Sequence, residues 1–184
     1  MIIGNFIKEI DTKYKNHYFS GICFDSSKCK RDNIFFAIKG TKINANQFIN
    51  QAIQNGAKTI ISNQKFEGIK KKILFIRSFN VRKSLSEFSY KFYKGKPKNI
   101  VAVTGTNGKS SVSDFYFQIL KLKKKKVASI GTLGIKTQSG IKKVSNTTVN
   151  PITLSKTLNI LKKKKIDNVI MEASSHGLKQ NRLD

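Results

Sequence analysis

The sequence lacks a long apolar segment and has only two cysteines. No apolar stretch reaches the roughly 18 residues that a membrane span needs, so we expect no such span. The first residues contain no basic segment followed by a long apolar core, so we expect no secretion signal. Cys23 and Cys29 lie six positions apart without a histidine pattern. We therefore expect free thiols in a cytoplasmic protein, not a disulfide or a metal site.

Acidic residues are also scarce. The chain has 36 Lys and Arg against 10 Asp and Glu, for a formal net charge of +26. Taken alone, this charge favours nucleic-acid or anionic-lipid binding. However, most basic residues are lysines, and the few arginines do not cluster. Because arginine is the preferred reader of phosphates and bases, and because a composition rich in Lys, Asn, Ile and Phe is typical of an AT-rich genome, we expect no nucleic-acid partner.

The length and hydrophobic content predict a folded protein of one large or two small domains. The chain has 184 residues, of which 39% are hydrophobic. A Gly- and Pro-containing break at residues 95–98 predicts a boundary between domain 1–97 and domain 98–184. The first domain reads as alternating short strands and helices. We expect strands at residues 21–24, 34–38, 59–61 and 73–76 and helices at 46–55 and 81–93, the last with Leu85, Phe88, Phe92 and Tyr93 in the core.

The second domain reads as a βαβ series. The predicted strands are residues 100–103, 127–130 and 168–172, and the predicted helices are 109–121 and 152–161. The first strand is continuously apolar, which predicts burial on both faces of a parallel sheet. Lysine runs at 123–126 and 162–165 follow the helices, where cations stabilise the negative end of the helix dipole. The expected fold class is α/β, a small α/β domain followed by the first part of a parallel-sheet P-loop domain.

A glycine-rich loop lies between the apolar strand and the helix that follows it. Backbone amides at its glycines and at the helix start favour a phosphate ligand. Lys109 would neutralise the outer phosphates, and the Ser110 hydroxyl would bind Mg²⁺. Val103 replaces the glycine that is commonest six residues before the lysine, so the loop is a shorter variant. We expect ATP and Mg²⁺ as ligands and Lys109 as a catalytic residue. The predicted ATP-binding residues are Gly105, Thr106, Asn107, Gly108, Lys109, Ser110 and Ser111.

Polar residues also lie at the end of the predicted strand 168–172 and just before the predicted helix 152–161. Glu172 is the last residue of its predicted strand, where an α/β fold binds ligands. A carboxylate beside a phosphate site is a natural magnesium ligand, so Ser110 and Glu172 are the predicted metal ligands. The trio Asn146, Thr147 and Thr148 precedes the second helix and on its own predicts only a loop.

These motifs together resemble the Mur ligase family, and within it the UDP-N-acetylmuramoyl-tripeptide synthetases. The phosphate loop is shared by the wider family, which includes the folylpolyglutamate synthetases. Residues 145–148 and 171–182 are more specific to the one branch. Residues 24–27 and 32–40 are similar to the family's uridine-nucleotide-binding domain, although Ser27 and Asn33 stand where Arg and Gly are frequent.

The resemblance implies an ATP-dependent amide ligase of peptidoglycan synthesis. Such an enzyme adds meso-diaminopimelate or L-lysine to UDP-MurNAc-L-Ala-D-Glu through an acyl phosphate. It also implies a cytoplasmic monomer, with a neutral His176 supporting the loop of Ser174. The implied contacts with the UDP-sugar substrate are Phe24, Ser26, Thr41, Lys42, Ile43, Asn146, Thr147, Thr148, Ser174, Gln180 and Arg182.

The resemblance covers the whole chain but only part of such an enzyme. We expect the carbamylated lysine, the second-metal histidine and the domain that selects the amino acid to lie beyond Asp184, so this chain alone should have little or no ligase activity. Three alternatives stay open. A non-catalytic nucleotide- and UDP-sugar-binding fragment would release no ADP. A nucleic-acid binder would show a steep salt dependence. A sister ligase would prefer a folate or dipeptide substrate, although residues 146–148 and 174–176 argue against it.

Overall fold

The structure, a computed structural model, describes residues 1–40, 45–143 and 148–183. The chain divides into two compact units, Met1–Phe88 and Ser89–Asp184. In the described residues, no helix is long and apolar enough to cross a membrane. The predicted division after residue 97 falls in the coil that follows helix α2 (Val81–Phe92), whereas the compact units divide inside that helix. The exact domain limits therefore stay a prediction.

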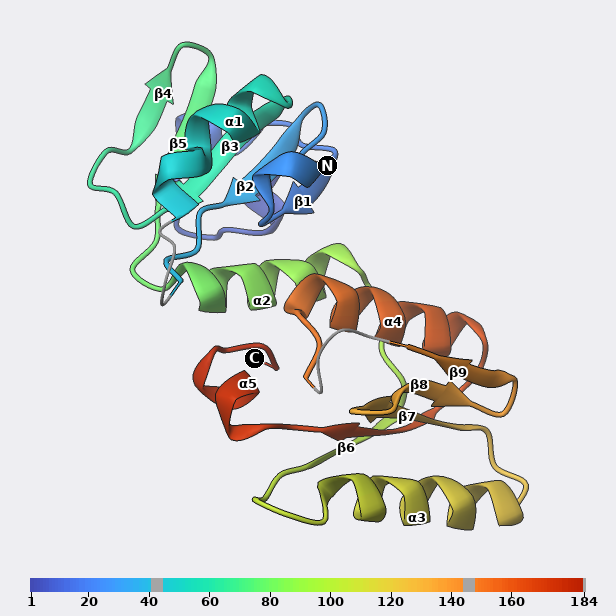
Figure 1. Cartoon of the computed structure of the whole chain (residues 1–184). Helices are drawn as coiled ribbons and strands as arrows, with labels where there is room; N and C mark the ends of the chain where they lie inside the picture. The colour runs from blue at the N-terminus through green and yellow to red at the C-terminus, as the bar shows by residue number, and fades with distance from the viewer. Residues whose placement is uncertain (41–44, 144–147, 184) are drawn as a thin grey trace. The chain divides into compact units, whose positions relative to one another are not determined.

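The first unit is built on a five-stranded sheet of order β1-β2-β3-β5-β4 (Figure 1). All neighbouring strands run parallel except β4, which is antiparallel to β5. Four of the strands match the predicted segments, and β4 was not predicted. The strands are β1 (Gly21–Cys23), β2 (Asn33–Phe36), β3 (Ala57–Ser62), β4 (Gly68–Lys70) and β5 (Ile73–Arg77). The predicted helix at 46–55 is a 3-10 turn (Ala45–Phe48) that continues as α1 (Ile49–Gln54). Further 3-10 turns are Ile3–Asn5, Thr12–Tyr14 and Ser26–Lys28.

Two hydrophobic clusters form the core of this unit, because successive strand residues point to opposite faces. Phe35 packs in one cluster with Ala52 of α1 and Ile60 of β3. Phe36 lies on the other side, with its ring centroid 5.5 Å from that of Phe88 in α2. The predicted core role of Leu85 and Phe88 is confirmed, since both are buried. Phe92 and Tyr93 are only half-buried and contact each other edge to face.

The two cysteines are paired as a disulfide, with their Cα atoms 5.8 Å apart. The prediction of free thiols is wrong. The 3-10 turn Ser26–Lys28 reverses the chain between them, so both side chains point into the cluster beside α1. The sequence spacing alone does not reveal this reversal.

The second unit has a five-stranded sheet of order β6-β10-β7-β8-β9. The predicted parallel part is confirmed: β10 pairs in parallel with both β6 and β7. Figure 1 shows α3 and α4 on opposite faces of this sheet. The strands are β6 (Asn99–Val103), β7 (Val127–Gly131), β8 (Gly134–Thr137), β9 (Gly140–Lys142) and β10 (Asn168–Glu172). The helices are α3 (Lys109–Leu122), α4 (Pro151–Lys163) and α5 (Ser175–Lys179).

Three features of this unit differ from the prediction. The antiparallel hairpin of β8 and β9 occupies a stretch for which the sequence analysis predicted no strand. Helix α5 was not predicted either. Strand β6 was expected to be buried on both faces, but in the described chain it pairs only with β10 and Val101 is 40% exposed. The apolar run correctly predicted a strand. Burial of that strand on both faces would need packing partners that the described residues do not supply.

Candidate functional site

The glycine-rich loop joins the carboxyl end of β6 to the start of α3, as predicted. Gly105 and Gly108 have positive φ values of 146° and 81°, which side-chain-bearing residues rarely adopt. Gly108 is the N-cap residue of α3, and it has no side chain that could accept a hydrogen bond from the first amides of the helix. The first N–H groups of the helix therefore lack side-chain capping and point to the exposed loop, where an anion would bind them.

The ammonium of Lys109 is folded back over this loop. Its Nζ donates to the backbone carbonyls of Gly105, at 2.7 Å, and Thr106, at 3.1 Å. These carbonyls carry only partial charge, so a phosphate placed on the loop would be a stronger partner for the ammonium. The predicted role of Lys109 is compatible with this position.

Glu172 is buried at the end of β10, where its carboxylate accepts three hydrogen bonds. It is only 4% exposed. Its Oε2 accepts from Ser110 Oγ at 3.1 Å and from Thr132 Oγ1 at 2.8 Å, and its Oε1 accepts from the Thr132 amide at 3.2 Å. Within the described ranges, no Lys, Arg or His forms an ion pair with it. A buried carboxylate without a counter-charge is costly, and a divalent cation would supply that charge.

The donor set fits magnesium bound together with phosphate. Among the described residues, no group of three His, Cys, Asp or Glu side chains comes together to hold a metal. Magnesium commonly uses one or two carboxylates and completes its shell with phosphate oxygens and water. Ser110 and Glu172, which were predicted together, are therefore a suitable pair beside a phosphate loop.

Sequence reasoning missed Gly131 and Thr132, which complete this cluster. Strands β7 and β10 are parallel neighbours, with Ile130 opposite Met171, so both strands end at the same edge of the sheet. A Cβ on Gly131 would lie 2.2 Å from Glu172 Oε1, so a side chain at position 131 would displace the carboxylate from its present place. Both residues follow the predicted strand 127–130. The rule that ligands bind beyond the carboxyl ends of strands could therefore have identified them from the sequence.

A second polar cluster adjoins Glu172 and joins four of the predicted substrate residues. Thr148 is buried, and its Oγ1 lies 3.0 Å from Ser174 Oγ and 3.2 Å from the Glu172 carbonyl. The Arg182 guanidinium donates to the Thr148 carbonyl and, at 2.7 and 3.0 Å, to Gln180 Oε1. The structure therefore brings together Thr148, Ser174, Gln180 and Arg182. Asn146 and Thr147 lie outside the described residues.

His176 does not support the loop of Ser174, so this expectation is wrong. The exposed imidazole contacts the Gln180 side chain one helical turn later, at 2.6 Å. The Ser174 hydroxyl instead caps α5 by accepting from the Gly177 amide at 3.0 Å. A short capped helix therefore holds this loop, and the sequence analysis did not predict that helix.

The predicted uridine-site residues of the first unit show mixed exposure. Ser26 is buried, and its hydroxyl lies 2.6 Å from Gln51 Oε1, to which it donates. Phe24 is exposed, and Thr41, Lys42 and Ile43 lie outside the described residues. Ser27, which stands where Arg is frequent, donates to the Asp25 carboxylate and thereby lowers the pKa of that carboxyl.

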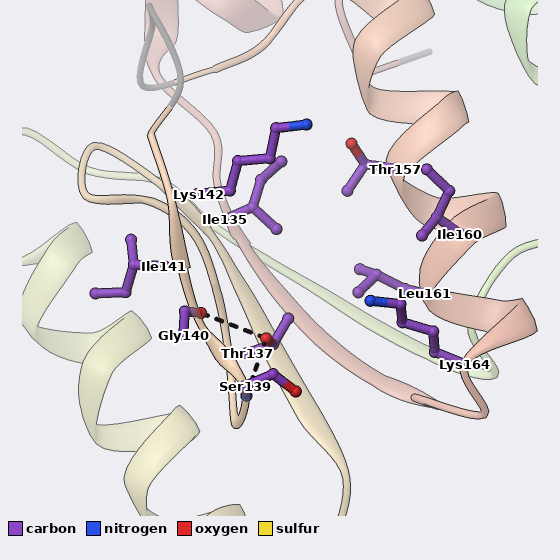
Figure 2. Close-up of a pocket in the computed structure, with 10 residues that line it drawn as sticks. All are labelled: Ile135, Thr137, Ser139, Gly140, Ile141, Lys142, Thr157, Ile160, Leu161 and Lys164. Carbon is purple, nitrogen blue, oxygen red and sulfur yellow. Dashed lines mark hydrogen bonds between the residues drawn. The ribbon is translucent and has the colours of Figure 1, made fainter.

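A separate hollow of about 460 Å³ lies between the second half of α4 and the β8–β9 hairpin. Figure 2 shows Leu161 of α4 and Lys164, the residue after α4, reaching toward it, with Ile135 and Lys142 on the hairpin side. Its lining contains two lysines and no carboxylate. Without a carboxylate it offers a cation no opposite charge, so the metal prediction stays with Ser110 and Glu172.

Comparison with known proteins connects both units to one family. Residues 103–184 match the Mur ligase middle domain, and residues 18–93 match the Mur ligase family catalytic domain. The chain belongs to the Mur ligase family. The match to the middle domain begins at Val103 and so contains the phosphate loop and Glu172 of this Mur ligase chain.

Curated relatives carry the name UDP-N-acetylmuramoyl-L-alanyl-D-glutamate–2,6-diaminopimelate ligase. The Rickettsia prowazekii protein is 40% identical over 174 residues, which is 92% of this chain and 36% of the relative. The Wigglesworthia glossinidia brevipalpis protein is 39% identical over 183 residues, or 95% of this chain and 37% of the relative. The Mur ligase chain thus spans just over a third of the length of these relatives.

Solved structures agree with this placement. A UDP-N-acetylmuramoyl-L-alanyl-D-glutamate–2,6-diaminopimelate ligase superposes with a TM-score of 0.85 and 28% identity, over 100% of this chain and 38% of that one. A MurF ligase from Thermotoga maritima in complex with ADP superposes with a TM-score of 0.55 over 84% of this chain and 32% of that one. Its identity is 18%, so it supports the fold alone.

Proposed function

We propose that this chain binds ATP, Mg²⁺ and UDP-MurNAc-L-Ala-D-Glu as part of a cytoplasmic ligase that adds 2,6-diaminopimelate to that precursor. One observation carries the proposal: the phosphate loop, the buried Glu172 carboxylate and the cluster of Thr148, Ser174 and Arg182 lie at the carboxyl end of one sheet. The names of the relatives support the choice of diamino acid.

The loop and Glu172 would hold the nucleotide and its metal. The backbone amides of residues 105–111 would bind the phosphates, with the Lys109 ammonium moving from the Gly105 and Thr106 carbonyls to the phosphate oxygens. Ser110 and Glu172 would hold magnesium, which when bound would neutralise charge on the phosphates. The hydroxyl and the carboxylate already lie within hydrogen-bond distance of each other.

The second cluster would hold the precursor. Arg182 presents a guanidinium that is half-buried and now bonded to neutral oxygens, which a carboxylate or pyrophosphate would replace as stronger partners. Thr148 and Ser174 would fix the backbone around it. Asn146 and Thr147, and in the first unit Phe24, Ser26 and residues 41–43, remain predicted contacts for the UDP-sugar.

The reaction would need alignment more than acid–base chemistry. The terminal phosphoryl group of ATP would pass to the D-glutamyl side-chain carboxylate, so that the later leaving group is phosphate and not oxide. The amine of the diamino acid would then attack the acyl phosphate and form the amide. This chain would contribute positioning of two anions and charge neutralisation by Lys109.

Calorimetric titration of the chain tests the proposal. We expect separate binding of MgATP and of UDP-MurNAc-L-Ala-D-Glu. Lys109→Ala should weaken only the first, and Arg182→Ala only the second, because each side chain would contact one ligand. Lys121→Ala, on the far end of α3, is the matched control. Failure of the wild-type chain to bind either ligand would overturn the proposal.

A coupled ADP-release assay separates the ligase from its alternative. We expect the 184-residue chain to bind both ligands and release little or no ADP, as a binding fragment would. Turnover by a protein as long as the curated relatives, with the same site residues, would then assign these sites to a ligase. A preference of that protein for a folate or dipeptide substrate would favour a sister enzyme.

A further inference from the structure

We propose that Thr132 is a positioning residue for the metal site. It holds the Glu172 carboxylate in the orientation that a cation needs, and the absence of a side chain at Gly131 leaves the carboxylate room to lie there. The inference rests on the proposed function, because it concerns the magnesium site suggested there. It adds two residues that neither the sequence motifs nor the phosphate loop contain.

The geometry around the carboxylate singles out Thr132. Of the three hydrogen bonds that the Glu172 carboxylate accepts from described residues, Thr132 supplies two, one to each carboxylate oxygen, from its amide at 3.2 Å and its hydroxyl at 2.8 Å. Bonds to both oxygens fix the plane of the carboxylate, which the Ser110 hydroxyl alone, bonded to Oε2, leaves free to rotate. Partners of this kind orient ligating carboxylates in metal sites.

Gly131 makes this arrangement possible. The ideal Cβ position of Gly131 lies 2.2, 2.4 and 2.7 Å from the Oε1, Cδ and Cγ atoms of Glu172. The carboxylate therefore occupies the volume that any other residue at position 131 would fill. Because β7 ends at Gly131, the next residue turns its amide and hydroxyl toward the end of β10.

Core packing does not account for the hydroxyl of Thr132. The residue is exposed and lies in the turn between β7 and β8, whereas Glu172 is buried. If Ser110 used its oxygen for the metal, the two bonds from Thr132 would still hold the carboxylate. Valine at this position keeps the amide bond and the side-chain shape but loses the bond to Oε2.

Binding of Mn²⁺, followed by electron paramagnetic resonance in the presence of ADP, tests the proposal on the chain itself. We expect Thr132→Val to weaken Mn²⁺ affinity about 10- to 100-fold, as loss of an outer-shell partner does. Thr132→Ser should restore it, since serine keeps the hydroxyl. Thr157→Val, which removes a buried hydroxyl from α4, is the matched control and should bind Mn²⁺ as the wild type does.

Two further measurements separate positioning from folding. Metal-free ADP affinity and the melting temperature without metal should not change in Thr132→Val, because the loop and the core are untouched. Gly131→Ala should also weaken Mn²⁺ binding by displacing the carboxylate, and it serves if Thr132→Val does not fold. Equal Mn²⁺ affinity in wild type and Thr132→Val, or no recovery with serine, would overturn this inference alone. A wild-type chain that binds no Mn²⁺ with ADP would overturn the proposed metal site and this inference with it.

Discussion

The two ends of the second sheet hold their polar groups in opposite ways. At the carboxyl end, Glu172 and Thr148 are buried, and each makes several hydrogen bonds. At the amino end, the lysines at 123–126 and 162–165 are exposed, and an ion pair joins Lys162 to Asp167 at 3.0 Å. Burying polar groups costs free energy, whereas solvated lysines cost little. The buried polar groups therefore indicate the candidate site better than the net charge does.

The largest effect should come from the lysine of the phosphate loop. In a full-length protein of this family, we expect Lys109→Ala to reduce ligation by at least about 10²–10³-fold, because charge stabilisation of this kind contributes that much. Product formation from UDP-MurNAc-L-Ala-D-Glu, ATP and the diamino acid is the measurement. Unchanged ADP release with all substrates present would contradict the role of this end of the sheet.

A smaller effect, on the free energy of unfolding, is expected from substitution of Gly177. Its ideal Cβ lies 2.6 Å from Thr148 Cγ2, so Gly177→Ala should push Thr148 away from Ser174. We expect a loss of about 1–3 kcal/mol in the free energy of unfolding, as overpacking usually costs. Urea titration measures it, with the exposed Leu178→Ala on the same helix as control. Equal stability of both variants would show that this cluster is loosely packed.

The ion pair between Asp114 in α3 and Lys136 in β8 should contribute less. The atoms Asp114 Oδ1 and Lys136 Nζ lie 2.6 Å apart, and the hydrogen bond from Lys136 lowers the pKa of Asp114 below its usual 3.8. A lowered pKa means stability that is present above pH 3.8 and is lost as the pH falls through the folded value. We expect Asp114→Asn to cost up to about 1 kcal/mol at pH 7 and progressively less under acid. A cost independent of pH would contradict this origin.

The smallest effect is expected from the lysines of the amino end. Replacing residues 123–126 together by glutamine should leave the affinities for MgATP and for the UDP precursor unchanged, because those residues lie at the opposite end of the sheet from the phosphate loop. The same variant tests the nucleic-acid alternative. RNA binding by the wild type that is steeply salt-dependent and is lost in this variant would give the amino end a function of its own.

The predicted parts of this unit are those whose signal is local. The apolar run at 100–103, the glycine-rich loop and the helix after it are adjacent in sequence, so their arrangement followed from order alone. Glu172 was found because it ends a strand. Thr132 was not, because its contact with Glu172 joins residues 40 positions apart and depends on β7 and β10 being neighbours.

The misses in sequence reasoning have similar physical causes. Strands β8 and β9 are short and contain lysine and glycine, so they lack the branched and aromatic run that marked the other strands. Their pairing with each other and with β7 stabilises them instead. The contact between Cys23 and Cys29 likewise depends on the turn between them, which was not predicted from residues 24–28.

The affinity for ATP with and without Mg²⁺, compared between wild type and Glu172→Gln, tests the central claim most directly. Glutamine keeps the size of the side chain and removes its charge. We predict that Mg²⁺ strengthens ATP binding to the wild-type chain and that this gain disappears in Glu172→Gln, while metal-free ATP binding stays the same. An equal gain in both proteins would contradict the assignment of Glu172 as a metal ligand.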